Sequence, residues 1–136
     1  MSHHNFMRMA INLAKKNIGN TGVNPSVACL IEKDNCVLTI GTTGNSGRPH
    51  AEYNAIKNTK KNLKGSTAYV TLEPCSHEEE TPSCARILAE AGVAKVVSPL
   101  ADPNPIVNGK GFEMLKNYGV TVQIDDYYKR EAYKII

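Results

Sequence analysis

Five short runs rich in apolar and β-branched residues place the strongest limit on how this chain folds. They cover residues 27–31, 36–40, 67–72, 93–97 and 120–124. Only a polar turn separates the first two runs, which is typical of a hairpin. The later runs alternate with segments of helical periodicity, and strands that alternate with helices pair in parallel through right-handed crossovers. The sequence therefore predicts an α/β fold in which helices cover both faces of a mixed five-stranded sheet.

The helical segments have recognisable ends. We expect helices over residues 6–18, 50–62, 82–91 and 111–118, and a last one after Asp125. Gly19, Gly65 and Gly92 follow the first three segments, and glycine is favoured just past the end of a helix. Thr81 is a favoured N-cap residue, and Pro82 suits the first helical position. The second and third helices are therefore expected to begin directly after loops.

Composition excludes several classes of function. The chain has 136 residues, a length that suits one domain with its own core. Its net charge is +3 and its basic residues are scattered, so we expect no nucleic-acid partner. No apolar run approaches the roughly 20 residues of a membrane span, and the N-terminus lacks a signal-peptide pattern. We therefore expect a cytoplasmic protein with reduced thiols and no membrane association.

Histidine and cysteine residues fall into two groups. Cys29 and Cys36 lie inside strand-forming runs and are expected to pack, and His3 and His4 are expected to belong to an unstructured start. The second group consists of His50, Cys75 and Cys84, each of which stands beside a predicted element. His50 opens a helix, Cys75 follows a strand, and Cys84 lies in the first turn of the next helix. Ligands favour such crevices at strand ends in open α/β sheets.

One imidazole, two thiolates and a nearby carboxylate indicate catalytic zinc. His50, Cys75 and Cys84 supply three ligands and leave the fourth position for water. Glu52, two residues after the histidine, is expected to take the proton of that water and pass it to the substrate and the departing ammonia. A structural zinc site is the alternative, because His77 lies two residues past Cys75 and offers a fourth ligand.

At this point the chain resembles a known family, the deaminase domain of the bacterial bifunctional riboflavin biosynthesis protein, within the cytidine deaminase-like superfamily. The matching segments cover nearly the whole chain: Asn24-Pro25-Ser26-Val27, His50-Ala51-Glu52, Thr71-Leu72-Glu73-Pro74-Cys75-Ser76-His77, Thr81-Pro82-Ser83-Cys84, Asp102-Pro103-Asn104-Pro105 and Asn108-Gly109-Lys110-Gly111. The eight-residue gap between the two cysteines is distinctive, since most relatives in the superfamily use Pro-Cys-x-x-Cys.

The resemblance implies a three-layer α/β/α fold and a single zinc-dependent deaminase domain over residues 1–136. It implies zinc on His50, Cys75 and Cys84, Glu52 as the proton shuttle, and a homo-oligomer. The implied reaction is hydrolytic deamination of 2,5-diamino-6-ribosylamino-4(3H)-pyrimidinone 5′-phosphate. The positions that line the substrate pocket in this family are, here, Asn24, His77, Asp102 and Asn104. From local sequence alone Asn24 reads as a turn residue.

The chain departs from the family pattern in three respects. Glu80 stands where the family usually has a lysine or arginine suited to a phosphate, and a carboxylate there would repel that group. Thr43 stands where the family usually has a histidine, seven residues before the zinc ligand. The chain also has no room for the reductase domain of the bifunctional protein, so we expect either a separate reductase enzyme for the NADPH-dependent step or a longer protein of which this chain is a fragment.

These departures leave two other hypotheses beside the riboflavin-pathway deaminase. One is a zinc deaminase of another small nucleobase or nucleoside, which Glu80 and Thr43 favour. The other belongs to a different class, an inactive zinc-stabilised subunit that binds a partner enzyme, and the intact Glu52 argues against it. A transfer-RNA deaminase is disfavoured because the chain lacks a basic aromatic surface.

Overall fold

A computed structural model of the chain describes residues 3–78 and 81–136. Its centre is a five-stranded sheet of strand order β2-β1-β3-β4-β5. The strands are β1 (Ala28–Lys33), β2 (Cys36–Thr42), β3 (Thr67–Val70), β4 (Lys95–Ser98) and β5 (Thr121–Ile124). β1 pairs antiparallel with both β2 and β3, whereas β3, β4 and β5 are parallel. The mixed sheet expected from the sequence is therefore confirmed.

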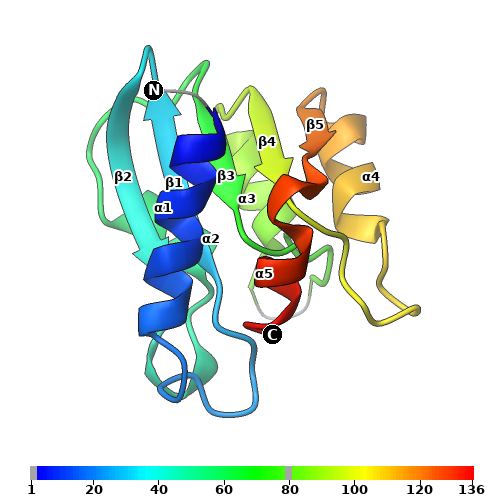
Figure 1. Cartoon of the computed structure of the whole chain (residues 1–136). Coiled ribbons are helices and arrows are strands. Elements are labelled where there is room, and N and C mark those ends of the chain that lie inside the picture. Colours follow the sequence, from blue (N-terminus) through cyan, green and yellow to red (C-terminus); the bar gives the residue numbers. More distant parts are fainter. Residues whose placement is uncertain (1–2, 79–80) are drawn as a thin grey trace.

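Helices cover both faces of this sheet, which gives the three expected layers (Figure 1). α1 (His3–Lys16) and α5 (Lys129–Tyr133) lie in front of the strands in this view, and α2 (Ala51–Lys57), α3 (Cys84–Glu90) and α4 (Lys110–Asn117) lie behind them. Two short 3-10 helices, η1 (Asn45–Gly47) and η2 (Asp126–Tyr128), complete the elements of the described part. No helix in residues 3–78 and 81–136 combines the length and the apolar character needed to cross a bilayer.

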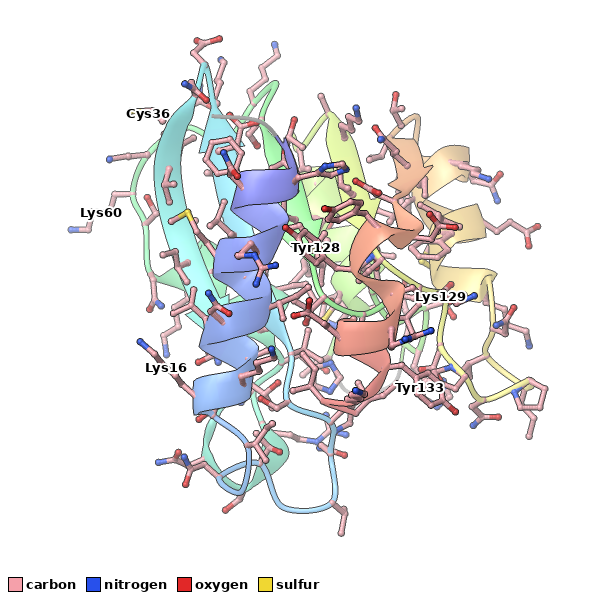
Figure 2. All side chains as sticks on the ribbon, viewed as in Figure 1. Lys16, Cys36, Lys60, Tyr128, Lys129 and Tyr133 are labelled. Carbon is pink, nitrogen blue, oxygen red and sulfur yellow. The ribbon has the colours of Figure 1, made fainter. Side chains whose placement is uncertain are left out.

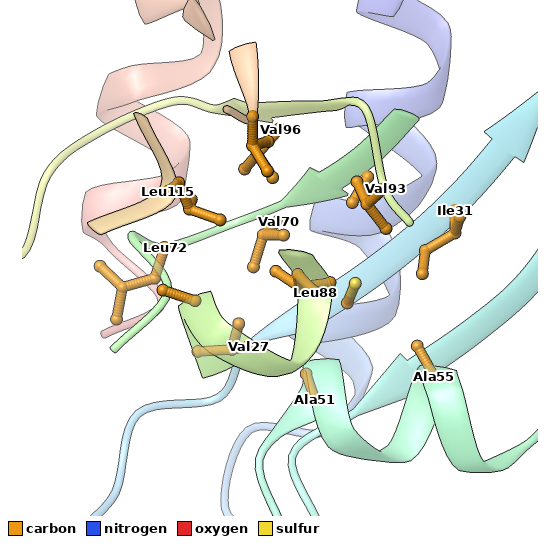
Figure 3. Close-up of a cluster of buried hydrophobic side chains, with 14 of the residues drawn as sticks. Val27, Ile31, Ala51, Ala55, Val70, Leu72, Leu88, Val93, Val96 and Leu115 are labelled. Carbon is orange, nitrogen blue, oxygen red and sulfur yellow. The ribbon is translucent and has the colours of Figure 1, made fainter. Parts of the chain in front are cut away.

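The strands alternate their side chains between two apolar clusters. Ile31, Val70 and Val96 point towards α2, α3 and α4, where Leu88 of α3 is fully buried among them (Figure 3). Leu30 and Tyr69, their neighbours in the sheet, point to the other face and pack against α1. Because both faces of β1, β3 and β4 are covered, these strands consist of continuous apolar runs rather than alternating ones.

The bounds of two helices differ from the sequence expectation. α2 begins at Ala51 with His50 as its N-cap, and it ends at Lys57 rather than near residue 62. The helix lasts only as long as Ala51 and Ala55 face the core; beyond it the Asn58 side chain donates to the Ile40 carbonyl of β2 at 3.3 Å. α3 begins at Cys84, because Ser83 rather than Thr81 is its cap and accepts a hydrogen bond from Arg86 N at 3.1 Å.

Two further expectations also need correction. His4 is part of α1, and its ring stacks on Tyr127 with centroids 4.4 Å apart and pairs with Asp125 at 3.0 Å, so the chain is ordered earlier than expected. Cys36 is exposed at the start of the edge strand β2 rather than packed in the core (Figure 2). In the same view Tyr128 lies between α1 and α5, where Arg8 donates to its hydroxyl at 3.3 Å.

The segment after β3 is fixed from two sides. Glu73 is buried, and its carboxylate accepts hydrogen bonds from Asp102 N, Gly109 N and Phe112 N at 2.8, 2.9 and 3.0 Å. The backbone of Gly111 in α4 lies so close to the Pro74 carbonyl oxygen that no Cβ fits between them. These contacts hold the backbone directly before Cys75 against the start of α4.

We therefore expect Gly111→Ala to destabilise the protein by about 3 kcal/mol or more, because the added methyl overlaps a buried backbone oxygen that cannot move freely. Gly119→Ala is the matched control, since Gly119 has φ +88 but open space around it, and its cost should be left-handed strain of about 1 kcal/mol. Urea unfolding of both variants measures the difference. Equal losses would contradict the close approach.

Candidate metal centre

His50, Cys75 and Cys84 converge although they come from three different elements. His50 is the N-cap of α2, Cys75 lies in the loop after β3, and Cys84 is the first residue of α3. Their ligand atoms all lie within 4.8 Å of one another. The sequence-based expectation that strand ends and helix starts bring these three together agrees with this placement.

The distances suit one tetrahedral zinc ion. His50 Nδ1 lies 3.8 Å from Cys75 Sγ and 3.5 Å from Cys84 Sγ. Tetrahedral zinc with bonds of about 2.3 Å to sulfur and about 2.0–2.1 Å to nitrogen separates those atoms by about 3.5–3.6 Å. Two sulfurs and one nitrogen are also the donor set that zinc prefers. The three residues therefore fit zinc, with the imidazole coordinating through Nδ1.

Backbone hydrogen bonds hold the two cysteines in this position. Cys84 N donates to Cys75 Sγ at 3.3 Å, and Ala85 N donates to the Cys75 carbonyl at 3.1 Å. The N-terminal turn of α3 thus closes over the loop after β3. An N–H directed at a sulfur atom favours its thiolate form.

The ionisation of the two thiols depends on their closeness. The hydrogen bond with Cys84, followed by that with His50, lowers the pKa of Cys75 to about 4. The hydrogen bond with Cys75 and burial raise the pKa of Cys84 well above its ordinary value. The hydrogen bond with Cys75 also raises the pKa of the His50 imidazole. One thiolate forms readily at this site, whereas the second requires a cation, which is what a bound metal ion provides.

Glu52 lies beside the ligands in a buried position. It is in the first turn of α2, and its side chain is 4% exposed. Burial raises its pKa to about 7, although a hydrogen bond with its own backbone N–H and the nearby His50 favour the charged form. A carboxyl group that titrates near neutral pH is suited to both accepting and releasing a proton.

A cavity of about 480 Å³ opens onto the three ligands. The remaining residues of its wall come from the segment before α2, from α2 itself, from the segment leading into α3 and from α3 itself: Arg48, Pro49, Tyr53, His77, Thr81, Pro82 and Ile87. This volume lies within the usual range of about 300–1,000 Å³ for small-molecule pockets. The structure thus brings His77 into the same cavity as the metal ligands.

The other expected substrate contacts lie elsewhere. Asn24 and Asp102 line a second hollow of about 610 Å³, and the Asn24 amide donates to the Gly47 carbonyl at 2.9 Å. Asp102 Oδ1 accepts from Asn104 N at 2.9 Å, and Asn104 Oδ1 accepts from Ile106 N at 3.0 Å. Asp102 and Asn104 thus accept hydrogen bonds from the backbone of their own loop, whereas Asn24 donates to the backbone of the loop that precedes α2.

One of the two substitutions that depart from the family pattern, Thr43, can be located in the described part of the chain. Thr43 is buried away from the cavity, where its hydroxyl accepts from Val27 N at 2.9 Å and joins the end of β2 to the start of β1. Glu80 lies outside the described residues. Sequence reasoning missed Glu73 and Arg48. Glu73 is signalled only by its place between a strand and Pro74-Cys75, and Arg48 by its place two residues before His50.

Replacing either sulfur ligand should remove the metal. We expect Cys75→Ser and Cys84→Ser to weaken zinc binding by more than the roughly 10–100-fold that loss of a ligand's hydrogen-bonding partner costs. Cys36→Ser, at an exposed cysteine outside the cluster, is the matched control and should bind like the parent protein. Zinc content after dialysis and competition with a chromogenic chelator measure this. Full zinc retention by Cys84→Ser would contradict the proposed ligand set.

The pKa of Glu52 has a consequence for stability. In excess chelator, the folded chain keeps Glu52 protonated up to a pKa of about 7, against 4.5 for the ordinary group. As pH rises, Glu52 therefore loses its proton in the unfolded chain before it does so in the folded chain. The contribution of Glu52 to the free energy of unfolding thus becomes less favourable to the folded state between pH 4.5 and pH 7.

We accordingly expect Glu52→Gln, which cannot ionise, to gain stability over the parent protein by about 1 to 3 kcal/mol at pH 8. At pH 4.5 the gain should be small. Urea unfolding at the two pH values, with chelator present, measures the difference. A stability difference that is the same at both pH values would show that Glu52 ionises normally.

Known proteins share this arrangement. A sequence model of the cytidine and deoxycytidylate deaminase zinc-binding region matches residues 1–99. The riboflavin biosynthesis protein RibD of Haemophilus influenzae is 48% identical over 115 residues, which cover 85% of this chain and 31% of that protein. The RibD structure of Acinetobacter baumannii superposes with a TM-score of 0.88 at 45% identity and covers 96% of this chain and 36% of its own.

A structure from Thermotoga maritima, named a diaminohydroxyphosphoribosylaminopyrimidine deaminase/5-amino-6-(5-phosphoribosylamino)uracil reductase, gives a TM-score of 0.89 at 38% identity and covers 98% of this chain and 40% of its own. The chain thus spans about a third of the length of the curated relatives it matches. The family match covers well over half of the chain and includes His50, Glu52, Cys75 and Cys84. The chain therefore belongs to the cytidine and deoxycytidylate deaminase zinc-binding family, and its resemblance to RibD deaminase domains is confirmed.

Proposed function

We propose that this chain is the zinc-dependent deaminase of riboflavin biosynthesis that acts on 2,5-diamino-6-ribosylamino-4(3H)-pyrimidinone 5′-phosphate. The observation that carries this proposal is a three-ligand zinc set at the base of an open cavity, beside a buried carboxyl group with a pKa near 7. A structural zinc site closes its fourth position, whereas a catalytic site keeps it open. The relatives named for the same deaminase support the choice of substrate.

The residues of the site have two roles in the reaction, metal binding and proton transfer. His50, Cys75 and Cys84 hold zinc, which when bound supplies a Lewis acid that lowers the pKa of a coordinated water to about 7. Glu52 accepts one proton from the attacking water and delivers it to the ring nitrogen of the substrate, while the water oxygen bonds to the ring carbon. It then moves the remaining proton of that oxygen to the amino group, so that the C–N bond breaks, ammonia leaves and a ring carbonyl remains. Proton transfer of this kind contributes roughly 10²–10⁴-fold to the rate.

The cavity wall contains two histidines, His50 of the metal cluster and His77. We propose that it contacts the substrate rather than closing the fourth zinc position. The metal cluster found among the described residues contains His50, Cys75 and Cys84 and does not include His77, which supports this assignment. We also propose substrate contacts for Asn24, Asp102 and Asn104, in line with the family resemblance.

The wider setting of the enzyme follows from the same proposal. Residues 1–136 act as one deaminase domain in a pathway that also includes a reductase function, for which the similar Thermotoga maritima protein is named. The four cysteines are free thiols, which supports a cytoplasmic location. Exposed apolar side chains around the second hollow, at Ile18, Val23 and Tyr133, support a homo-oligomer.

Ammonia release tests the proposal directly. Zinc-loaded protein should release ammonia from the phosphorylated diaminopyrimidine, and Glu52→Gln should lower kcat by roughly 10²–10⁴-fold. The variant should keep its zinc, because Glu52 is not among the three ligands. Cytidine and deoxycytidine 5′-phosphate are the comparison substrates. Preference for either of these, or no turnover by protein with a full complement of zinc, would refute the assignment.

A further inference from the structure

The wall of the zinc cavity contains one permanently charged side chain among the residues that the structure describes, Arg48. The other side chains of the wall are apolar, hydroxyl-bearing, imidazole or thiol groups. None of the described wall residues is a carboxylate, and Glu52 is buried beside the ligands. Apart from a metal ion bound by His50, Cys75 and Cys84, the described wall therefore offers a negatively charged part of a ligand one permanently charged group, Arg48.

Arg48 is exposed, and within residues 3–78 and 81–136 its guanidinium has neither an ion pair nor a hydrogen bond. The nearby Arg86 differs in this respect. Its guanidinium pairs with Glu78 at 2.9 Å and with Glu90 at 3.4 Å, so two carboxylates offset its charge. Among the described residues, Arg48 is thus the guanidinium of this region that retains its full capacity to bind an anion.

The backbone that carries Arg48 is held firmly. Ser46 N donates to the Asn20 carbonyl at 2.8 Å, and Gly44 N donates to the Pro49 carbonyl at 2.9 Å. The Asn24 amide holds the Gly47 carbonyl, and a Cβ on Gly47 would lie only 2.7 Å from the Thr21 carbonyl oxygen. The loop around Arg48 is therefore fixed against residues 20–24, which reduces the entropy lost when its side chain binds a ligand.

The short sequence separation of Arg48 from His50 also suits a contact with a substrate phosphate. Arg48 precedes His50 by two residues, so their Cα atoms lie within about 7 Å of each other, since a chain spans at most about 3.3–3.6 Å per residue. A pyrimidine that reacts at the metal carries its 5′-phosphate on the far side of a ribose. A long arginine side chain at the wall of the cavity can reach that far end without approaching the reacting ring.

We propose that Arg48 binds the 5′-phosphate of the substrate and thereby determines the preference for a phosphorylated pyrimidine. This inference rests on the proposed deaminase function. Arg48 assumes the role that a lysine or arginine at the position of Glu80 is expected to have in relatives. Its guanidinium presents two parallel N–H groups to two phosphate oxygens, a geometry that a lysine ammonium cannot reproduce.

The first test is selectivity for the phosphate. We expect Arg48→Gln to reduce the ratio of kcat/KM for the phosphorylated over the dephosphorylated substrate by roughly 10- to 100-fold, the usual range for a charge-assisted hydrogen bond. Arg48→Lys should give an intermediate ratio, because it keeps the charge and loses the paired N–H groups. Arg130→Gln, at an exposed arginine of α5, is the matched control and should keep the parent ratio.

The second test does not depend on turnover. Calorimetric titration with ribose 5-phosphate, and with ribose as its uncharged counterpart, measures phosphate binding by the parent protein and the three variants. Weaker ribose 5-phosphate binding by Arg48→Gln, with Arg130→Gln unchanged, would support the inference even if the diaminopyrimidine proves to be the wrong substrate. Equal binding by the parent and Arg48→Gln, no binding by the parent, or an unchanged selectivity ratio would overturn the inference. Zinc content and thermal unfolding would show that each variant is folded.

Discussion

Mutual repulsion between two neighbouring thiolates is the constraint around which this structure is arranged. Cys75 and Cys84 share a hydrogen bond that favours ionisation of the first and opposes ionisation of the second. A divalent cation removes the conflict, and His50 completes a donor set of zinc dimensions. The fold contributes three segments that end at the same place, so that the ion joins α2, α3 and the loop after β3. Metal binding and folding are therefore linked in this region.

The support around the ligands consists of carboxylate and amide groups that bind backbone atoms. Glu73 accepts three backbone N–H groups from the segment that leads into α4, and Asn24 holds the loop that precedes α2. Each of these side chains immobilises a segment next to a zinc ligand. The rigidity of the site thus depends on polar contacts outside the two apolar clusters, which a pattern of hydrophobic residues does not reveal.

Local periodicity was sufficient to predict the strands and the order in which strands and helices follow each other. Both faces of the central strands are covered, so their apolar runs are continuous. The convergence of His50, Cys75 and Cys84 was also predictable, since each follows a strand or stands at the start of a helix. Helix boundaries were harder. Thr81 is followed by Pro82, which suits the first position of a helix, yet Ser83 is the cap and α3 begins at Cys84, where the N–H of this residue meets Cys75 Sγ. Such long-range contacts have no signature in the local sequence.

On the proposed role of Arg48, the cation that binds the phosphate lies on a different segment from the one expected in relatives. The segments before α2 and before α3 both form the wall of one cavity, through Arg48 on one side and Thr81 on the other. Each segment ends at a residue of the metal cluster, His50 in one case and Cys84 in the other. The sequence has an acidic residue directly before Thr81 and an arginine shortly before His50. A cation before His50 in place of one before Thr81 preserves the attraction for a phosphate. Coulomb energy depends on distance and surroundings, not on which segment carries the charge.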